Sequence, residues 1–69
     1  MNRSKQLREK IMEVGKNIAL KNKEDERLKE VYSLIKNLNG FNASFKNEES
    51  EIAIKWLNNI ESKLALINI

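Results

Sequence analysis

The sequence predicts an all-α protein, a small bundle of three helices. Apolar residues recur at helical spacing in three segments, no segment alternates as a strand does, and the chain has no proline and only two glycines. With 69 residues, the chain is expected to be a single helical domain, residues 1–69. A domain of this size buries only about 60% of the surface that its unfolded chain exposes. We therefore expect a homo-oligomer, and specifically a dimer.

The first helix is expected near residues 3–21. Its apolar residues step by four, three and four positions and so share one helix face: Leu7, Ile11, Val14 and Ile18. A stripe of this width is typical of a helix that faces a core.

The segment LKNKEDERL, residues 20–28, decides whether the first two helices are separate. The heptad register of the stripe continues through it but falls on Lys21 and Asp25, which leaves two turns without an apolar contact. Asn22 can cap a new helix, and residues 21–23 are long enough for the turn of a helical hairpin. We favour the hairpin plus a third helix. One continuous helix through residues 20–28 is the alternative.

The second helix is expected near residues 24–38. Its stripe steps by three, four and three: Leu28, Val31, Ile35 and Leu38. Asn39 and Gly40 predict its end, because glycine takes the left-handed position after a helix without steric cost. The following residues are expected to form a loop in which Phe41 and Phe45 fold back onto the core.

The third helix is expected near residues 48–68. Asn47 is the predicted cap, and Glu48 and Glu49 would lie near the positive end of the helix dipole. The stripe has Ile52 and Trp56 on one side, and its members step by four, three, four and three: Ala53, Leu57, Ile60, Leu64 and Ile67.

The composition argues against catalysis. The chain has no cysteine, no histidine, no Gly-rich phosphate loop and no metal-ligand spacing. We expect a non-enzyme with no catalytic residue, cofactor, metal or small-molecule substrate. A helix-turn-helix motif is disfavoured, because seven residues separate Gly40 from Glu48 where that motif has a turn of about 3–4.

Positive charge is concentrated in the first third of the chain. Residues 1–23 hold seven of the 13 lysines and arginines but only two of the 10 acidic residues. One flank of the first helix is the candidate partner-binding site: Lys5, Arg8, Met12, Lys16 and Lys23. Such a flank can face an acidic protein, contact phosphates or simply keep the domain soluble. No aromatic residue lies between the cations, which disfavours stacking on single-stranded nucleic acid.

Several apolar residues lie off the three stripes or at their edges. A monomeric bundle would expose some of them, and clustered exposed apolar residues mark interfaces. Met12 and Leu20 belong to this group, and the candidate interface residues are Leu34, Ile54, Trp56, Leu66 and Ile69. Trp56 is at the same time a good core residue, because its burial removes a large apolar area from water.

The sequence therefore predicts a non-catalytic interaction protein. It would bind a protein partner through a helix face and modulate the activity or assembly of that partner. The alternative is a small basic regulator that binds nucleic acid as a dimer. No apolar run approaches the roughly 18 residues of a membrane span, and no apolar segment of a signal peptide follows the charged N-terminus. We expect a cytoplasmic protein.

Overall fold

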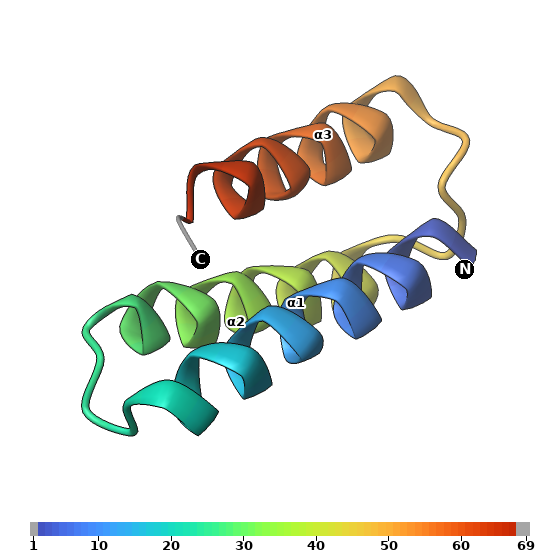
Figure 1. Cartoon of the computed structure of the whole chain (residues 1–69). Coiled ribbons are helices and arrows are strands. Elements are labelled where there is room, and N and C mark those ends of the chain that lie inside the picture. The colour runs from blue at the N-terminus through green and yellow to red at the C-terminus, as the bar shows by residue number, and fades with distance from the viewer. Residues whose placement is uncertain (1, 68–69) are drawn as a thin grey trace.

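Three helices form an elongated bundle in the computed structural model, which describes residues 2–67. Each helix is antiparallel to the next one along the chain (Figure 1). They are α1 (Asn2–Lys21), α2 (Arg27–Ser44) and α3 (Glu51–Leu66). The helices α1 and α2 form a hairpin, and α3 runs back along it (Figure 1). The dimensions are 38 × 17 × 15 Å. The predicted all-α three-helix bundle is confirmed, and the alternative of one continuous first helix is wrong. No helix within residues 2–67 is long and apolar enough to cross a membrane.

Polar side chains make the turn between α1 and α2. The Asn22 amide closes α1 on Ile18 O at 2.9 Å, and Asn22 Oδ1 accepts from the amide of Glu24 at 3.0 Å. Asp25 Oδ1 then accepts from the amide of Arg27 at 2.9 Å, and Asp25 Oδ2 lies 2.6 Å from the guanidinium. These hydrogen bonds from Arg27 lower the pKa of Asp25 to about 2. The predicted cap is therefore wrong: Asn22 starts the turn, and α2 begins at Arg27 rather than near residue 24.

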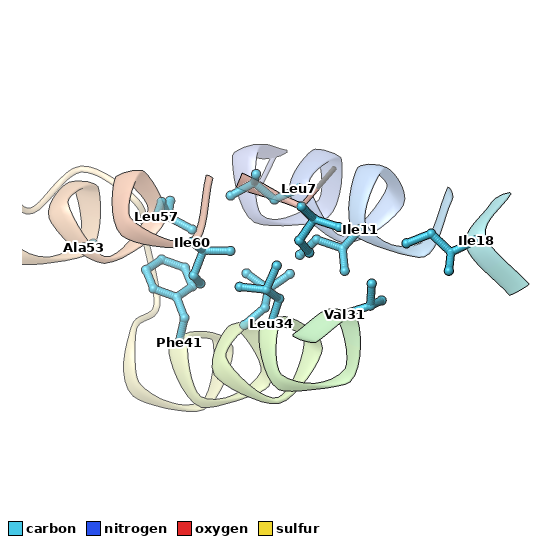
Figure 2. Packing of buried hydrophobic residues seen from close by; sticks show 11 residues of the cluster. Leu7, Ile11, Ile18, Val31, Leu34, Phe41, Ala53, Leu57 and Ile60 are labelled. Atoms are coloured by element: carbon cyan, nitrogen blue, oxygen red, sulfur yellow. The ribbon is translucent and has the colours of Figure 1, made fainter. Parts of the chain in front are cut away.

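All three helices contribute to one buried core (Figure 2). The stripes predicted on α1 and α3 face it, with Val14 and Leu64 at its edge. On α2 the buried face is rotated from the prediction. Its members also step by three, four and three: Val31, Leu34, Leu38 and Phe41. Leu28 and Ile35, which the sequence placed in the core, are only partly buried.

The helix α2 does not end at Gly40, as the sequence predicted. Gly40 has no positive φ, and the helix continues to Ser44 before the extended Phe45 ends it. The continued helix places Phe41 on the buried face of α2, where its side chain is fully buried. Burying a phenylalanine contributes about 1.5–3 kcal/mol, whereas a glycine inside a helix costs about 1 kcal/mol. Of the predicted loop, the inward packing of Phe41 and Phe45 is confirmed.

The helix α3 is capped by Ser50 and not by Asn47. Ser50 has the extended backbone of a cap residue, and its Oγ accepts from the amide of Ala53 at 3.2 Å. Asn47 Oδ1 instead accepts from the amide of Glu49 at 3.0 Å, within the connection from α2. The helix consequently starts three residues later than predicted.

The two glycines differ in the space around them, which yields a matched pair of substitutions. A Cβ on Gly15 would lie 2.9 Å from Val31 Cγ1, whereas on Gly40 it would meet only Trp56 Cζ2 at 3.7 Å. We expect Gly40→Ala to stabilise the protein by about 0.5–1 kcal/mol through helix propensity alone. For Gly15→Ala the same gain is opposed by an overpacking cost of about 1–3 kcal/mol. Urea unfolding should show a stabilised Gly40 variant and a neutral or destabilised Gly15 variant. Equal stabilisation of both would contradict the close contact of α1 with α2.

Candidate protein-binding site

An open groove runs along the hairpin between α1 and α2, with a volume of about 260 Å³. We call it the α1–α2 groove. Among the described residues, only α1 and α2 line it: Met12, Gly15, Lys16, Ala19, Leu28, Val31, Tyr32 and Ile35. Since α3 takes no part, the groove is a feature of the hairpin itself.

The close approach of Gly15 to Val31 forms the floor of this groove. Both residues are buried. Because Gly15 has no side chain, the side chain of Val31 packs directly against the backbone of α1. Each helix then supplies one wall with the same spacing of four and three residues. The wall on α1 is Met12, Lys16 and Ala19, and the wall on α2 is Leu28, Tyr32 and Ile35. Helical residues at this spacing share a face, so each wall is a continuous row of side chains.

The walls expose apolar surface. Met12 is 59% exposed and Tyr32 is 68% exposed. Leu28 and Ile35 are partly buried and pack against the core. Exposed apolar surface that continues into a buried floor is typical of a place where another molecule docks.

The charge at the groove has one sign. Lys16 lines the groove, and within residues 2–67 no acidic side chain lines it. Lys5 and Arg8 precede Met12 on the same flank of α1. Lys5 is exposed, while the half-buried Arg8 guanidinium donates to Asn39 Oδ1 of α2. Arg8 therefore also ties the two helices together.

The structure brings together four of the five residues predicted as the basic flank. Lys5, Arg8, Met12 and Lys16 follow one another at spacings of three, four and four along α1. Lys23 does not extend this row, because α1 ends at Lys21 and Lys23 lies in the turn. The sequence reasoning missed the wall on α2. The sequence signal for this wall is the spacing of Leu28, Tyr32 and Ile35, but Leu28 and Ile35 also fit the predicted core stripe.

The predicted apolar interface residues divide into several environments. Leu34 is buried in the core, so its assignment to the exposed set is wrong. Ile54 and Leu66 are exposed, as are Met12 and Leu20. Trp56 is half-buried: its ring meets Phe41 and Phe45 edge-on, and its Nε1 donates to Asn37 Oδ1 at 3.3 Å. Ile69 lies outside the residues that the structure describes.

A polar cluster joins the start of α1 to the connection between α2 and α3. The carboxylate of Glu48 accepts from the amides of Arg3 at 2.9 Å and Ser4 at 2.6 Å. Burial of Glu48 opposes its ionisation, but these hydrogen bonds and the charge of Arg3 leave its pKa below the usual value. Arg3 also donates to Asn58 Oδ1 of α3 at 2.6 Å. Glu48 thus caps α1, rather than starting the third helix as the sequence predicted.

Neither the α1–α2 groove nor this polar cluster has the arrangement of a metal centre. Within residues 2–67, no three histidine, cysteine or acidic side chains lie close enough to hold a metal ion. In the same part of the chain, every buried side-chain nitrogen and oxygen has a hydrogen-bond partner. The α1–α2 groove, unlike this polar cluster, offers open apolar surface to a partner. The chain matches no protein-family model, no curated protein and no solved structure.

Proposed function

We propose that the protein is a non-catalytic interaction protein that binds an acidic amphipathic helix of a partner protein in the α1–α2 groove. Binding there would modulate the activity or assembly of that partner. The observation that carries the proposal is the combination of exposed apolar walls with charge of one sign, supplied by Lys16 inside the groove.

The shape of the groove favours a helix as the bound element. Two helices with a groove between them accept the apolar face of a third, which inserts side chains at spacings of three, four and seven residues. Each wall extends over eight residues of its helix, a rise of about 10 Å at 1.5 Å per residue. That length accommodates two turns of a bound helix. Met12 suits such a contact because its unbranched side chain adapts to the surface it meets.

The charge favours an acidic partner. Lys16 is part of the wall on α1, and Lys5 lies about two turns before Met12 on the same flank. The exposed Lys36 follows Tyr32 by one turn on α2. Cations at the rim of an apolar interface steer an acidic partner into place and repel a basic one. A nucleic acid is a poorer fit, because phosphates and sugars are held by hydrogen-bond donors and charge rather than by exposed apolar side chains.

Binding kinetics with a designed probe test this proposal. The probe is an amphipathic helical peptide with leucines on one face and glutamates elsewhere, and its control carries lysines in place of the glutamates. We expect the acidic peptide to bind with an affinity that falls as salt rises, and the basic peptide not to bind. Tighter binding of random-sequence duplex DNA than of the acidic peptide would favour a nucleic-acid regulator and overturn the proposal.

Two double variants separate the position of the charge from its amount. Lys5→Gln with Lys16→Gln removes cations beside the groove, whereas Lys10→Gln with Lys21→Gln removes the same charge from the opposite flank of α1. We expect the first pair to slow association several-fold and the second to leave it near the parent value, since rim charges act mainly on the association rate. Both should fold normally, because exposed changes of this kind stay within about ±0.5 kcal/mol each. Equal slowing in both would show that only net charge matters.

A further inference from the structure

A second exposed apolar row follows α3 on a different side of the bundle. Five residues of α3 step by four, three, four and three, one position ahead of the core stripe: Ile52, Trp56, Asn59, Lys63 and Leu66. We call them the outer stripe. Ile52 and Leu66 are strongly exposed at its two ends, and Trp56 is half-buried. Trp56 packs against the core, whereas the two ends of the stripe are apolar but exposed.

The C-terminal half of the outer stripe borders a groove of about 340 Å³ between α2 and α3. We call it the α2–α3 groove. The lining residues on α2 are Lys29, Glu30, Ser33 and the buried Leu34. Those on α3 are Lys63 and Leu66. None of these residues lines the α1–α2 groove. The two surfaces can therefore be occupied at the same time.

The charges of the two grooves differ in a way that identifies the occupant. The α2–α3 groove carries charges of both signs, with Lys29 and Glu30 on α2 and Lys63 on α3. In a two-fold dimer every contact between two residues occurs twice, once in each direction. Lys63 of each copy can therefore face Glu30 of the other. The α1–α2 groove has only a cation and would repel its own copy. Charge complementarity thus fits the α2–α3 groove to a second copy of this chain.

We propose that two copies of the chain form a two-fold dimer through their α2–α3 faces. The exposed Leu66 of each copy enters the α2–α3 groove of the other, and Lys63 pairs with Glu30 across the interface. A stable interface covers about 800 Å² on each partner, which is about a sixth of the 5172 Å² surface of the chain. One side of a three-helix bundle is large enough to provide this area. The dimer leaves both α1–α2 grooves open on its outside.

Sedimentation equilibrium of the full chain at micromolar concentration tests the dimer. The parent is expected at twice the 8.1 kDa mass of the chain. Leu66→Asp should shift it to the monomer and raise the dissociation constant about tenfold or more, as loss of a central apolar anchor does. Leu20→Asp is the matched control, because Leu20 is 76% exposed and Leu66 is 82% exposed, but Leu20 lies at the end of α1. It should remain dimeric. A parent that sediments only as a monomer, or equal dissociation by both variants, overturns the proposal.

Charge reversal tests the pairing itself and does not depend on how well one variant folds. Glu30→Lys and Lys63→Glu should each weaken self-association, because both place like charges across the two-fold axis. An equimolar mixture of the two variants should recover a dimer with one copy of each, since the reversed charges then face opposite ones. Undiminished self-association of both single variants would show that the dimer uses another face. Failure of the mixture to associate, while the parent dimerises, would show that Lys63 and Glu30 do not pair across the interface. Peptide binding in the α1–α2 groove is measured separately, so the failure of either proposal leaves the other intact.

Discussion

Replacing Phe41 with alanine is expected to lower the free energy of unfolding by about 3–5 kcal/mol, the range for truncating a buried aromatic side chain. Phe41 is fully buried, stacks on Phe45 with ring centroids 5.0 Å apart and meets the edge of Trp56 at 5.9 Å. Figure 2 shows its ring rising from α2 toward Leu57 and Ile60 of α3. The ring thus joins α3 to the hairpin. Small domains have a total stability of only about 5–15 kcal/mol, so this loss would be a large part of the stability of the protein.

Phe45→Ala provides the control for this substitution. Phe45 belongs to the same aromatic cluster but is only partly buried and follows the last residue of α2. Its truncation should cost clearly less, because part of its ring already contacts water. Urea unfolding followed by circular dichroism measures both variants. Equal losses, or a small loss for Phe41, would contradict its full burial between α2 and α3.

Replacing Leu57 with alanine is expected to cost about 2–5 kcal/mol. Leu57 is fully buried on the face of α3 that meets the hairpin. The small residue Ala53 lies one turn before it on the same face, so little side-chain volume is available on that side to fill the cavity. The cost of such a substitution rises with the volume that remains empty. We therefore expect a loss in the upper part of the range.

Ile35→Ala is the informative comparison for Leu57. The apolar stripes of the sequence place both residues in the core, and they predict similar losses. In the structure Ile35 lies in the wall of the α1–α2 groove and is only partly buried. Its truncation leaves an open surface depression rather than an enclosed cavity, so we expect a smaller loss than for Leu57. Thermal unfolding of the two variants under the same conditions decides this, and equal losses would restore Ile35 to the core.

Local sequence patterns predicted the core-facing stripes of α1 and α3, because in each helix one set of apolar residues recurs at spacings of three and four. The end of α2 was not predictable from local signals. Asn39 and Gly40 resemble a helix end, and only the packing of Phe41 against α3 makes continuation of the helix favourable. The helix caps were wrongly predicted for a related reason. Asn22 and Asn47 have side chains suited to a cap, but both are used in turns that precede their helices.

The candidate site was predictable only on its α1 side. The row from Lys5 to Lys16 follows from the spacing of charged and apolar residues along one helix. Which flank of α2 faces solvent depends instead on where α3 docks, and on the close approach of Gly15 to Val31. Leu34 and Ile35 are neighbours in sequence, and either fits a core stripe. Tertiary packing buries Leu34 and leaves Ile35 beside the exposed Tyr32.

Amide NMR spectra of the labelled protein, recorded during addition of the acidic amphipathic peptide, would locate the bound helix on the surface. We predict that the largest chemical-shift changes fall on residues of the α1–α2 groove, among them Gly15, Ala19, Tyr32 and Ile35. Amides of the outer stripe, such as Ile52 and Leu66, should hardly change, and the basic control peptide should leave the spectrum as it was. Changes centred on the α2–α3 face, or the same changes with both peptides, would contradict binding of an acidic helix in the α1–α2 groove.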